Sequence, residues 1–325
     1  TRLTVVDEKT LYPPKLYSLL KKQQYHWVGN HSAVKKCKWL HESLVHNRVC
    51  YKEKFYGIKS HRCLQTSPAV LNCLTYCLHC WRALPEDIGL SWENVFHGVW
   101  DDPELIADGL FYEHNRILSG YKSQVLNGII EERKYKEALN PNQIAMSLSG
   151  EPTLYSHLID LIQIFKNLGC TVFLVTSGVL PAALESLIEK EVEPTKLYIS
   201  LSSPNQKSYL KLNRPIQLGL WFSLMKSLDI LENFKCSKVI RITAIKGLNM
   251  HSNDVDGFAK LIQRSGCSEV EVKGYMHVGF STIRLYEKNM PSFKDVKEFS
   301  EKLADIIGYK IKGEVSESRV TLLSK

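Results

Sequence analysis

Apolar and polar positions alternate with two different spacings along most of the chain. Short apolar runs have the length and composition of buried strands, and the stretches between them carry apolar residues at helical spacing. This alternation is typical of a parallel sheet whose strands are joined by right-handed helical crossovers. The predicted strands are 65–71, 143–149, 171–177, 196–202, 237–244 and 268–274.

Helices are expected between these strands. A long charged stretch at 103–139 has few helix-breaking residues and favours helix before the second strand. The later helices are 154–168, 181–190, a short group ending near 232, and 254–265. About six strand–helix units predict an α/β fold with a partial (β/α)6 barrel, because a complete barrel of this type needs eight.

Three regions are expected along the chain. Residues 1–62 contain Pro13 and Pro14 and two basic patches, and we predict an irregular N-terminal extension here instead of an independent domain. The partial barrel is expected at 63–285. Residues 286–325 are expected to form a helix and two short strands that pack on the barrel.

Composition narrows the class of protein. A chain of 325 residues with 44% hydrophobic and 23% charged residues can bury a sizeable core, in one large domain or two smaller ones. Residues 1–10 lack the basic-then-apolar pattern of a signal peptide, and no apolar run is long enough to span a membrane. The nine cysteines, an odd number, therefore indicate reduced thiols in the cytoplasm and not a disulfide framework.

The net charge of +8 is confined to the start of the chain. Residues 1–62 hold 13 basic against 4 acidic residues, whereas the rest of the chain is almost balanced. Aromatic residues such as Trp39 and Tyr51 lie among the basic ones, and this mixture suits an RNA backbone with stacked bases. The alternative is a solvated surface that aids solubility. The candidate RNA contacts are Lys35, Lys36, Lys38 and Arg62.

Three cysteines stand in the short segment NCLTYCLHCW, with the spacing C-x3-C-x2-C. Thiolates of Cys73, Cys77 and Cys80 can hold three corners of a four-iron, four-sulfur cluster and leave the fourth iron open to a small molecule. An electron-transfer cluster has four cysteine ligands, and structural zinc has four protein ligands. The spacing therefore predicts a cluster that binds a ligand, with part of a zinc site or chance as the alternatives.

A second set of three cysteines lies upstream. Cys37, Cys50 and Cys63 are separated by twelve residues each, so six of the nine cysteines fall within 44 residues. Equal gaps have no physical meaning by themselves, and chance is the alternative. Two incomplete ligand sets nevertheless predict two clusters, each with one open iron. The other thiols are expected to be ordinary core residues, namely Cys170, Cys236 and Cys267.

Polar residues follow three consecutive predicted strands. Ligands of barrels and open parallel sheets gather beyond the carboxyl ends of the strands. A glycine there lets a ligand approach the backbone, and the carboxylate of Glu151 suits the amino group of a zwitterion. The alternative reading of these positions is ordinary turn chemistry. The residues concerned are Ser149, Gly150, Glu151, Thr176, Ser177, Gly178, Ser200 and Ser202.

Two further features carry candidate chemistry. Lys52 follows Cys50 by two residues, and a lysine in a basic setting can act as an amine nucleophile. A solvated charge or a phosphate contact is the alternative. The segment 270–285 is rich in polar side chains for the end of a barrel, and we expect some of them to line the mouth of a pocket, from the set Lys273, Tyr275, His277 and Arg284.

Together these motifs resemble one family. The two cysteine triplets, the run SPAVLNCLTYCLHCWR, the loop SLSGEPTLY and the segment EVKGYMHVG are similar to the archaeal tRNA 4-demethylwyosine synthases, which are radical S-adenosylmethionine (SAM) enzymes. The resemblance covers the chain from about residue 25 to its end. It implies that the cluster on Cys73, Cys77 and Cys80, with His79 beside it, binds SAM, and that Glu151 holds the methionyl ammonium. The other strand-end residues would meet the ribose hydroxyls and the carboxylate.

The resemblance also implies a reaction. One electron cleaves SAM, and the resulting radical takes a hydrogen from the methyl group of N1-methylguanosine in phenylalanine tRNA (tRNA-Phe). The carbon radical adds to pyruvate, which loses its carboxyl carbon, and the third ring of 4-demethylwyosine closes. The cluster on Cys37, Cys50 and Cys63 would hold pyruvate at its open iron, whereas Lys52 matches the lysine that would form a Schiff base with it. Both routes stay open.

Partners follow from the same resemblance. The flavodoxin-like domain of the eukaryotic members has no counterpart in this sequence, which implies an external one-electron donor of flavodoxin or ferredoxin type. A monomer without membrane contact is expected. One departure is Ser177, where the family pattern has Asn. The alternatives are a radical SAM enzyme with another substrate and a non-catalytic, metal-stabilised RNA-binding protein, because the residues alone show neither pyruvate nor ring closure.

Overall fold

A computed structural model describes most of the chain in two compact units. The described residues are 12–91, 93, 95 and 98–325, so the first eleven residues of the predicted extension, including the segment without a signal-peptide pattern, lie outside them. The first unit contains Thr1–Cys50, Ile58–Asn72 and Leu84–Val172. The second unit contains Tyr51–Gly57, Cys73–Ala83 and Phe173–Lys325. The expected division at residues 62 and 285 stays a prediction.

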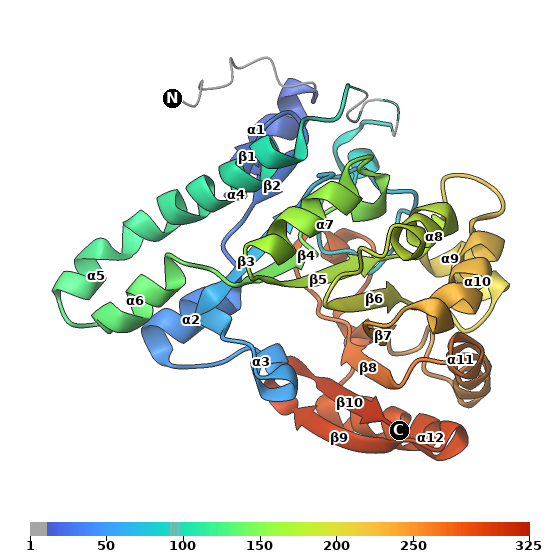
Figure 1. Cartoon of the computed structure of the whole chain (residues 1–325). Helices are drawn as coiled ribbons and strands as arrows, with labels where there is room; N and C mark the ends of the chain where they lie inside the picture. The colour runs from blue at the N-terminus through green and yellow to red at the C-terminus, as the bar shows by residue number, and fades with distance from the viewer. Residues whose placement is uncertain (1–11, 92, 94, 96–97) are drawn as a thin grey trace. The chain divides into compact units, whose positions relative to one another are not determined.

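The first unit has four strands that lie side by side in chain order (Figure 1). β1, β2 and β3 pair antiparallel, and β3 and β4 pair in parallel, with Cys63 opposite Gln143. The strands are β1 (His26–Val28), β2 (Ser32–Val34), β3 (Cys63–Ser67) and β4 (Gln143–Met146). The helices are α1 (Pro14–Lys22), α2 (Lys38–His46), α4 (Pro103–Leu118), α5 (Lys122–Leu126), α6 (Glu132–Ala138) and α7 (Leu158–Asn167).

The prediction of an irregular extension is wrong over residues 12–62. This stretch contains α1, β1, β2 and α2, and it ends in two shorter helices. Pro14 starts α1 instead of breaking it, because a proline at the first helical position loses no hydrogen bond. Leu16 and Leu20, four residues apart on one helix face, are fully buried. The two strands have three residues each, which is too short for an alternating pattern to be recognised.

The second unit carries a longer run of strands (Figure 1). β5 to β8 pair in parallel in chain order, and β10 then pairs antiparallel with both β8 and β9. The strands are β5 (Thr171–Thr176), β6 (Lys196–Ser200), β7 (Ser237–Ala244), β8 (Glu269–Gly274), β9 (Lys310–Val315) and β10 (Val320–Ser324). The helices are α3 (Tyr51–Tyr56), α8 (Pro181–Glu189), α9 (Gln206–Leu212), α10 (Leu220–Ile230), α11 (Ser252–Ser265) and α12 (Phe293–Ile307).

The predicted alternation is confirmed. Among the described residues, the six strands β3 to β8 take part in parallel pairs, with helices between successive strands from β4 onward, which gives the α/β class. The tail forms the expected helix and two strands, and β10 pairs with β8 at the edge of the sheet. The stretch 103–139 is three helices and not one, interrupted by the 3-10 turn Ser119–Tyr121 and by Gly128. In the part of the chain that is described, no helix is long and apolar enough to cross a membrane.

Candidate functional site

The cysteine loop, residues 73–80 in the second unit, brings two cysteines of the first triplet close to one hydroxyl group. The Sγ of Cys73 lies 3.5 Å from Thr75 Oγ1, and the Sγ of Cys77 lies 3.4 Å from the same oxygen. The backbone N–H of Cys80 donates to the carbonyl of Cys77 at 3.1 Å, which makes a tight turn between the last two cysteines. All three thiols are half-buried. The loop therefore presents three thiols in one short segment, as a three-ligand cluster requires.

Cys77 has a second polar neighbour that the sequence did not indicate. Asn213 Nδ2 lies 3.5 Å from its Sγ, and Ser203 Oγ donates to Asn213 Oδ1 at 2.8 Å, which orients the amide. Burial raises the pKa of the Cys77 thiol to about 11, and the nearby Cys80 adds to this, while Thr75 and Asn213 oppose it. The thiol thus stays protonated at neutral pH until a metal ion displaces the proton. No motif marks Asn213, because its contact depends on the fold.

Arg284 holds the backbone of the cysteine loop. Its guanidinium donates to the carbonyl oxygens of Leu78 at 3.3 Å, of Cys80, and of Arg82 at 3.4 Å. Gly279, in the same turn, has a φ of +58°, and a Cβ there would lie 2.4 Å from the carbonyl oxygen of Trp81. The turn 279–284 therefore packs directly on the loop. Arg284, in the predicted segment 270–285, therefore does reach the cysteine loop, but it contacts backbone carbonyls of the loop and not the thiols.

The other polar residues of that segment make structural contacts. Lys273 Nζ donates to the carbonyl of Ser318 at 2.9 Å. Tyr275 is buried, its hydroxyl donates to Ser281 Oγ at 3.0 Å, and His277 Nδ1 lies 3.1 Å from the same hydroxyl. Contacts within the protein therefore explain three of the four polar residues expected at a pocket mouth, and no ligand is needed to explain them.

His79 lies between Cys77 and Cys80 in sequence and meets one of the strand-end serines. Its Nε2 lies 3.5 Å from Ser202 Oγ, whereas its buried Nδ1 has no hydrogen-bond partner among the described residues. Burial lowers the pKa of His79 to about 4, and the positive charges of Arg284 and Arg82 lower it further, so the ring is neutral at pH 7. A buried ring nitrogen without a partner is normally satisfied by a further polar group, which fits a ligand at this position.

The other strand-end residues of the second unit form turns. Thr176 Oγ1 accepts the backbone N–H of Gly178 at 3.0 Å, and Gly178 has a φ of +73°. Its missing side chain leaves room for Leu224, because a Cβ would lie 3.1 Å from that residue. Turn chemistry thus explains Thr176 and Gly178 by itself. Ser177 and Ser200 are half-buried at the ends of β5 and β6.

In the first unit, the loop Ser149–Glu151 packs on the residues that precede Cys73 in the chain. Gly150 has a φ of +73°, and a Cβ there would lie 1.9 Å from the carbonyl oxygen of Ala69. The N–H of Glu151 donates to the carbonyl of Asn72 at 2.5 Å, and Ser149 Oγ accepts the N–H of Leu71 at 3.3 Å. Only glycine fits the second position of this loop, because the chain's own backbone approaches it, and the ligand contact that the sequence predicts for Gly150 stays a prediction.

The carboxylate of Glu151 is buried, with 2% of the residue exposed. Its Oε1 accepts from the backbone N–H of Thr153 at 3.2 Å and from Thr153 Oγ1 at 2.7 Å, and it thereby caps the 3-10 turn Pro152–Leu154. This capped turn is why α7 begins at Leu158 and not near the predicted residue 154. A buried carboxylate favours a cationic ligand.

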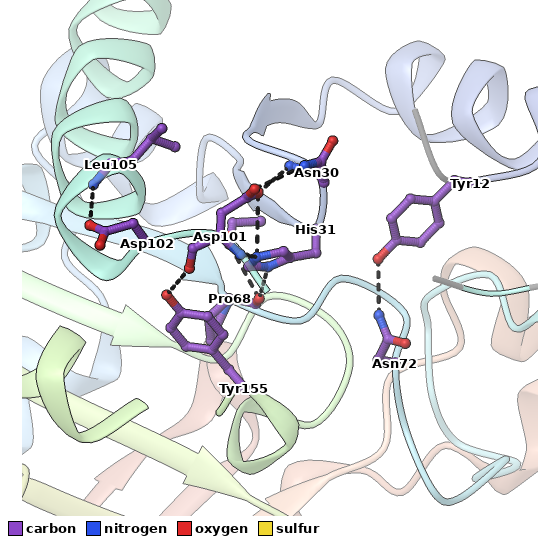
Figure 2. A network of polar contacts seen from close by, with 10 residues as sticks. Tyr12, Asn30, His31, Pro68, Asn72, Asp101, Asp102, Leu105 and Tyr155 are labelled. Carbon is purple, nitrogen blue, oxygen red and sulfur yellow. Dashed lines mark hydrogen bonds and ion pairs between the residues drawn. The ribbon is translucent and has the colours of Figure 1, made fainter. Parts of the chain in front are cut away.

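Figure 2 shows a network of polar contacts that includes Pro68, just before Ala69 on which the loop packs, and Tyr155, which follows the loop in the chain. His31 is fully buried; its Nδ1 lies 2.6 Å from the carbonyl of Pro68, and its Nε2 accepts the N–H of Asp101 at 2.8 Å. Tyr155 Oη donates to the carbonyl of Asp101 at 2.7 Å. Nδ1 therefore carries the proton, and burial lowers the pKa of His31, so the ring stays neutral. These contacts fix Pro68, which precedes the residues on which the loop packs, and they fix Tyr155, which follows the loop in the chain.

Tyr12 supports the same surface from another side (Figure 2). Its hydroxyl donates to the carbonyl of Val70 at 2.6 Å and accepts from Asn72 Nδ2 at 2.9 Å. Burial raises the pKa of Tyr12 well above its ordinary value, so the hydroxyl remains a donor. The sequence did not single out Tyr12, His31, Asp101 or Tyr155, because lone residues far apart in a chain carry no local signal for a shared network.

The second cysteine triplet lies in the first unit. Cys37 immediately precedes α2, which packs against the 3-10 turn Ser60–Arg62, and Cys63 follows that turn. The N–H of Cys50 donates to Ser60 Oγ at 2.8 Å. The fold thus links the three segments that carry these half-buried thiols.

Both triplets fit iron–sulfur clusters by the chemistry of their donors. All nine cysteines lie among the described residues and none of them forms a disulfide, so both sets keep their thiols. Cys170 and Cys267 are buried, as expected for core residues, and Cys236 is half-buried. Within the described ranges, no three side chains of His, Cys, Asp or Glu are already arranged as a metal site. The number of clusters stays a prediction.

Lys52 lies on α3 in the second unit, against two aromatic rings. Its Nζ is 4.4 Å from the ring centroid of Tyr198 on β6 and 4.5 Å from that of Phe173 on β5. A cation over a ring face is stabilised by the negative face of the π system. The side chain is half-buried, which argues against the alternative of a fully solvated charge.

The candidate RNA contacts lie in the first unit. Three ammonium groups lie over rings of their own chain: Lys35 over Tyr25 at 4.9 Å, Lys36 over Tyr121 at 5.1 Å and Lys38 over Trp39 at 5.8 Å. The guanidinium of Arg62 donates to the carbonyl of Asn140 at 3.0 and 3.1 Å. Arg62 also lines an open surface hollow of about 500 Å³ together with Glu132, Arg133, Lys136, Glu137 and Asn140.

Comparison with known proteins gives a consistent result. A family model described as "Wyosine base formation" matches residues 270–325. The S-adenosyl-L-methionine-dependent tRNA 4-demethylwyosine synthase of Pyrococcus abyssi is 40% identical over 314 residues, which are 96% of this chain and 89% of the relative. A solved structure of TYW1 with a lysine-pyruvate adduct bound is 35% identical, has a TM-score of 0.86, and covers 97% of this chain and 96% of its own.

A more distant structure bears on the fold alone. A radical SAM methyltransferase from Sphaerobacter thermophilus is 13% identical and has a TM-score of 0.53, with coverage of 90% of this chain and 79% of its own. The chain therefore has the radical SAM type of α/β fold that its strand pattern and cysteine spacing predicted.

Proposed function

Because the chain belongs to the S-adenosyl-L-methionine-dependent tRNA 4-demethylwyosine synthase family, we propose that it builds the tricyclic base 4-demethylwyosine on tRNA-Phe. The substrates are N1-methylguanosine in that tRNA and pyruvate, and the loss of the pyruvate carboxyl carbon makes the enzyme a carbon–carbon lyase. The observation that carries this proposal is the three-thiol loop 73–80 in a chain that is 40% identical to a named synthase over 96% of its length.

In the second unit, we propose that Cys73, Cys77 and Cys80 ligate a 4Fe–4S cluster. Such a cluster would supply the one electron that cleaves a carbon–sulfur bond of SAM. Asn213 Nδ2 donates to the sulfur of Cys77, Thr75 Oγ1 lies 3.4 Å from the same sulfur, and Arg284 fixes the backbone that carries the cysteines.

Neutral His79 and the strand-end residues are proposed to contact SAM. His79 presents its buried Nδ1, and Ser202 lies at its other nitrogen. The remaining contacts of the second unit would come from Thr176, Ser177, Gly178 and Ser200. A serine at 177 can still donate or accept one hydrogen bond where the family pattern has an amide.

In the first unit, the loop Ser149–Glu151 is proposed to bind the methionyl end of SAM. Gly150 exposes backbone, and Glu151 offers a buried carboxylate to the ammonium group. The support is the buried carboxylate of Glu151, on a loop whose position is held by the bond from the N–H of Glu151 to the carbonyl of Asn72 and, after the loop, by Tyr155 on the carbonyl of Asp101.

Pyruvate is proposed to bind through the second triplet and Lys52. Cys37, Cys50 and Cys63 would ligate a second 4Fe–4S cluster. The amine of Lys52 would attack the keto carbon of pyruvate, so that a C–N bond forms and the carbonyl oxygen leaves as water. The adduct in the solved TYW1 structure, between a lysine and pyruvate, supports the imine route over chelation alone.

The wider partners are proposed from charge and composition. The basic residues Lys35, Lys36, Lys38 and Arg62 would contact the tRNA backbone, and a flavodoxin- or ferredoxin-type protein would supply electrons. We propose a cytoplasmic monomer.

The test is product formation under anaerobic conditions. Reconstituted enzyme, SAM, pyruvate, a chemical reductant and tRNA-Phe carrying N1-methylguanosine are incubated, and the nucleosides of digested tRNA are identified by mass spectrometry. The tricyclic nucleoside is expected, and the same tRNA without the methyl group is the control. Cleavage of SAM with unaltered N1-methylguanosine would point to another substrate.

A further inference from the structure

Glu271 on β8 is a charged residue with no exposed surface. Three tyrosine hydroxyls donate to its carboxylate: Tyr56 at 2.8 Å, Tyr198 at 2.9 Å and Tyr51 at 3.2 Å. Arg241 Nε lies 3.9 Å from it. Burying a carboxylate is costly unless hydrogen bonds replace the lost water, so this arrangement is retained against a substantial penalty. The function described so far does not use it.

The three tyrosines connect Glu271 to Lys52. Tyr51 and Tyr56 are the first and last residues of α3, the helix that carries Lys52. Tyr198 places its ring 4.4 Å from Lys52 Nζ and its hydroxyl on Glu271. One carboxylate therefore holds both the helix that presents the amine and a ring on which the amine lies.

These hydrogen bonds persist over the working range of pH. Burial raises the pKa of Tyr198 well above its ordinary value, and the negative charge of Glu271 raises it further. The pKa of Tyr56 is raised for the same two reasons. Both hydroxyls thus remain protonated and continue to donate.

Other charged groups around α3 are matched by their own partners. Lys196 lies 3.9 Å from the Tyr56 ring and pairs with Glu269 at 2.5 Å. Lys273 lies 5.0 Å from the Tyr51 ring and donates to a backbone carbonyl. Lys52 differs from these two lysines because its ammonium lies over two rings, those of Tyr198 and Phe173, next to the Glu271 network.

We propose that Glu271 is a positioning residue for Lys52, which fixes α3 and Tyr198 so that the amine lies over the two ring faces where it meets pyruvate. This inference rests on the proposed function, because it needs Lys52 as the nucleophile. A ring face favours positive charge on the nitrogen, both in the ammonium and in the protonated imine that condensation with pyruvate yields along with water. Correct placement of reacting groups accounts for large rate factors.

The experiment is borohydride trapping on the reconstituted holoenzyme. Enzyme and pyruvate are mixed at several pyruvate concentrations, and the reduced adduct on Lys52 is quantified by peptide mass spectrometry. We expect Glu271→Ala to lower the maximal trapping rate by about tenfold or more, as misplacement of a reacting group does. Glu271→Gln keeps acceptor oxygen and should recover part of the rate.

Tyrosine variants separate the hydroxyl from the ring. Tyr198→Phe keeps the face under Lys52 but loses the bond to Glu271, and we expect it to slow trapping as well. Tyr309→Phe is the matched control, because it removes a tyrosine hydroxyl bonded to the carbonyl of Cys267 in the same unit and should leave the rate unchanged. SAM cleavage without tRNA should be retained in every variant, which distinguishes misplacement from general loss of structure.

The outcomes separate the inference from the function on which it rests. Wild-type rates in Glu271→Gln, Tyr56→Phe and Tyr198→Phe, with an adduct on Lys52 in each, would overturn the positioning role alone. A wild-type enzyme that forms no trapped adduct would overturn the imine route and the inference together. If Glu271→Ala does not fold, the trapping rates of Tyr56→Phe and Tyr198→Phe still decide the question.

Discussion

Gly150 packs so closely on Ala69 that a Cβ at this position would lie 1.9 Å from the carbonyl oxygen of Ala69. The contact joins the loop Ser149–Glu151 to the stretch that leads directly into Cys73. A backbone contact of this kind cannot adapt by rotating a side chain, and Gly150 also has a φ of +73°. The position therefore requires glycine for the packing of the first unit, independently of any ligand.

Gly150→Ala is accordingly expected to destabilise the protein and to weaken SAM binding. The left-handed backbone alone costs about 1–3 kcal/mol for a residue with a side chain, and the clash adds to this. Chemical denaturation and equilibrium binding of SAM measure the two effects. Gly120→Ala is the matched control, because a Cβ there has no neighbour within 4 Å and φ is not positive. Equal stability of the two variants would refute the packing argument.

Acid sensitivity should arise partly from His114. Burial lowers its pKa from 6.5 to about 4, and its Nε2 lies 3.0 Å from the carbonyl of Ala138. Between these two pH values the unfolded chain binds a proton that the folded protein does not, so the free energy of unfolding falls as pH falls from 6.5 to about 4.

His114→Gln should therefore show a shallower loss of stability than wild type across this window. Denaturant midpoints measured at several pH values provide the test. His157→Gln, at an exposed histidine, should retain the wild-type slope. An unchanged slope in His114→Gln would mean that the histidine is not held neutral by burial.

The affinity for tRNA should fall steeply as salt rises. If Lys35, Lys36 and Lys38 each neutralise a phosphate, their joint replacement by Gln should lower the salt slope by roughly one unit for each phosphate that is no longer neutralised. Binding isotherms at several salt concentrations measure the slope. Replacing Lys294, Lys302 and Lys310, which are exposed in the second unit, removes equal charge and should leave the slope unchanged. Equal effects of both triple variants would indicate a general charge effect.

The two cysteine triplets should have different roles. Substituting Cys37, Cys50 or Cys63 by Ala is expected to abolish the tricyclic product while SAM cleavage without tRNA survives. Substituting Cys73, Cys77 or Cys80 should abolish both, because SAM cleavage depends on that set. Iron analysis should show about half of the metal lost in either case, as expected for two clusters of equal size. Normal product from the Cys37, Cys50 and Cys63 variants would make that triplet structural.

Local signals explain which parts of the fold were predictable. The strands β4 to β8 are apolar runs between helices, so their place in the sequence was evident to within a few residues. β1 and β2 were missed because three-residue strands have no readable period, and Pro14 was taken as a sign of irregularity although it starts a helix. The pairing of β10 with β8 is a long-range contact that no local pattern encodes.

The candidate site shows the same division. Cysteine spacing and the loop around Gly150 are local motifs, but the close approach at Gly150 comes from the carbonyl of Ala69, whereas the sequence predicted the approach of a ligand. Asn213 and Arg284 are brought to the cysteine loop only by tertiary contacts. Glu271 lies in β8 between Val270 and Val272, where alternation would place a charged residue on a solvated face. Its three tyrosine donors come from residues 51, 56 and 198, and no spacing relates them.

The central claim is that this chain transfers pyruvate carbons to N1-methylguanosine in tRNA, and isotope tracing tests it most directly. Holoenzyme is incubated with SAM, a reductant, methylated tRNA-Phe and pyruvate that carries carbon-13 either in the carboxyl group or in the other two carbons. The account predicts a tricyclic nucleoside that contains label from the keto and methyl carbons and none from the carboxyl carbon. Label from the carboxyl carbon in the base, or no tricyclic nucleoside while SAM is cleaved, would contradict it.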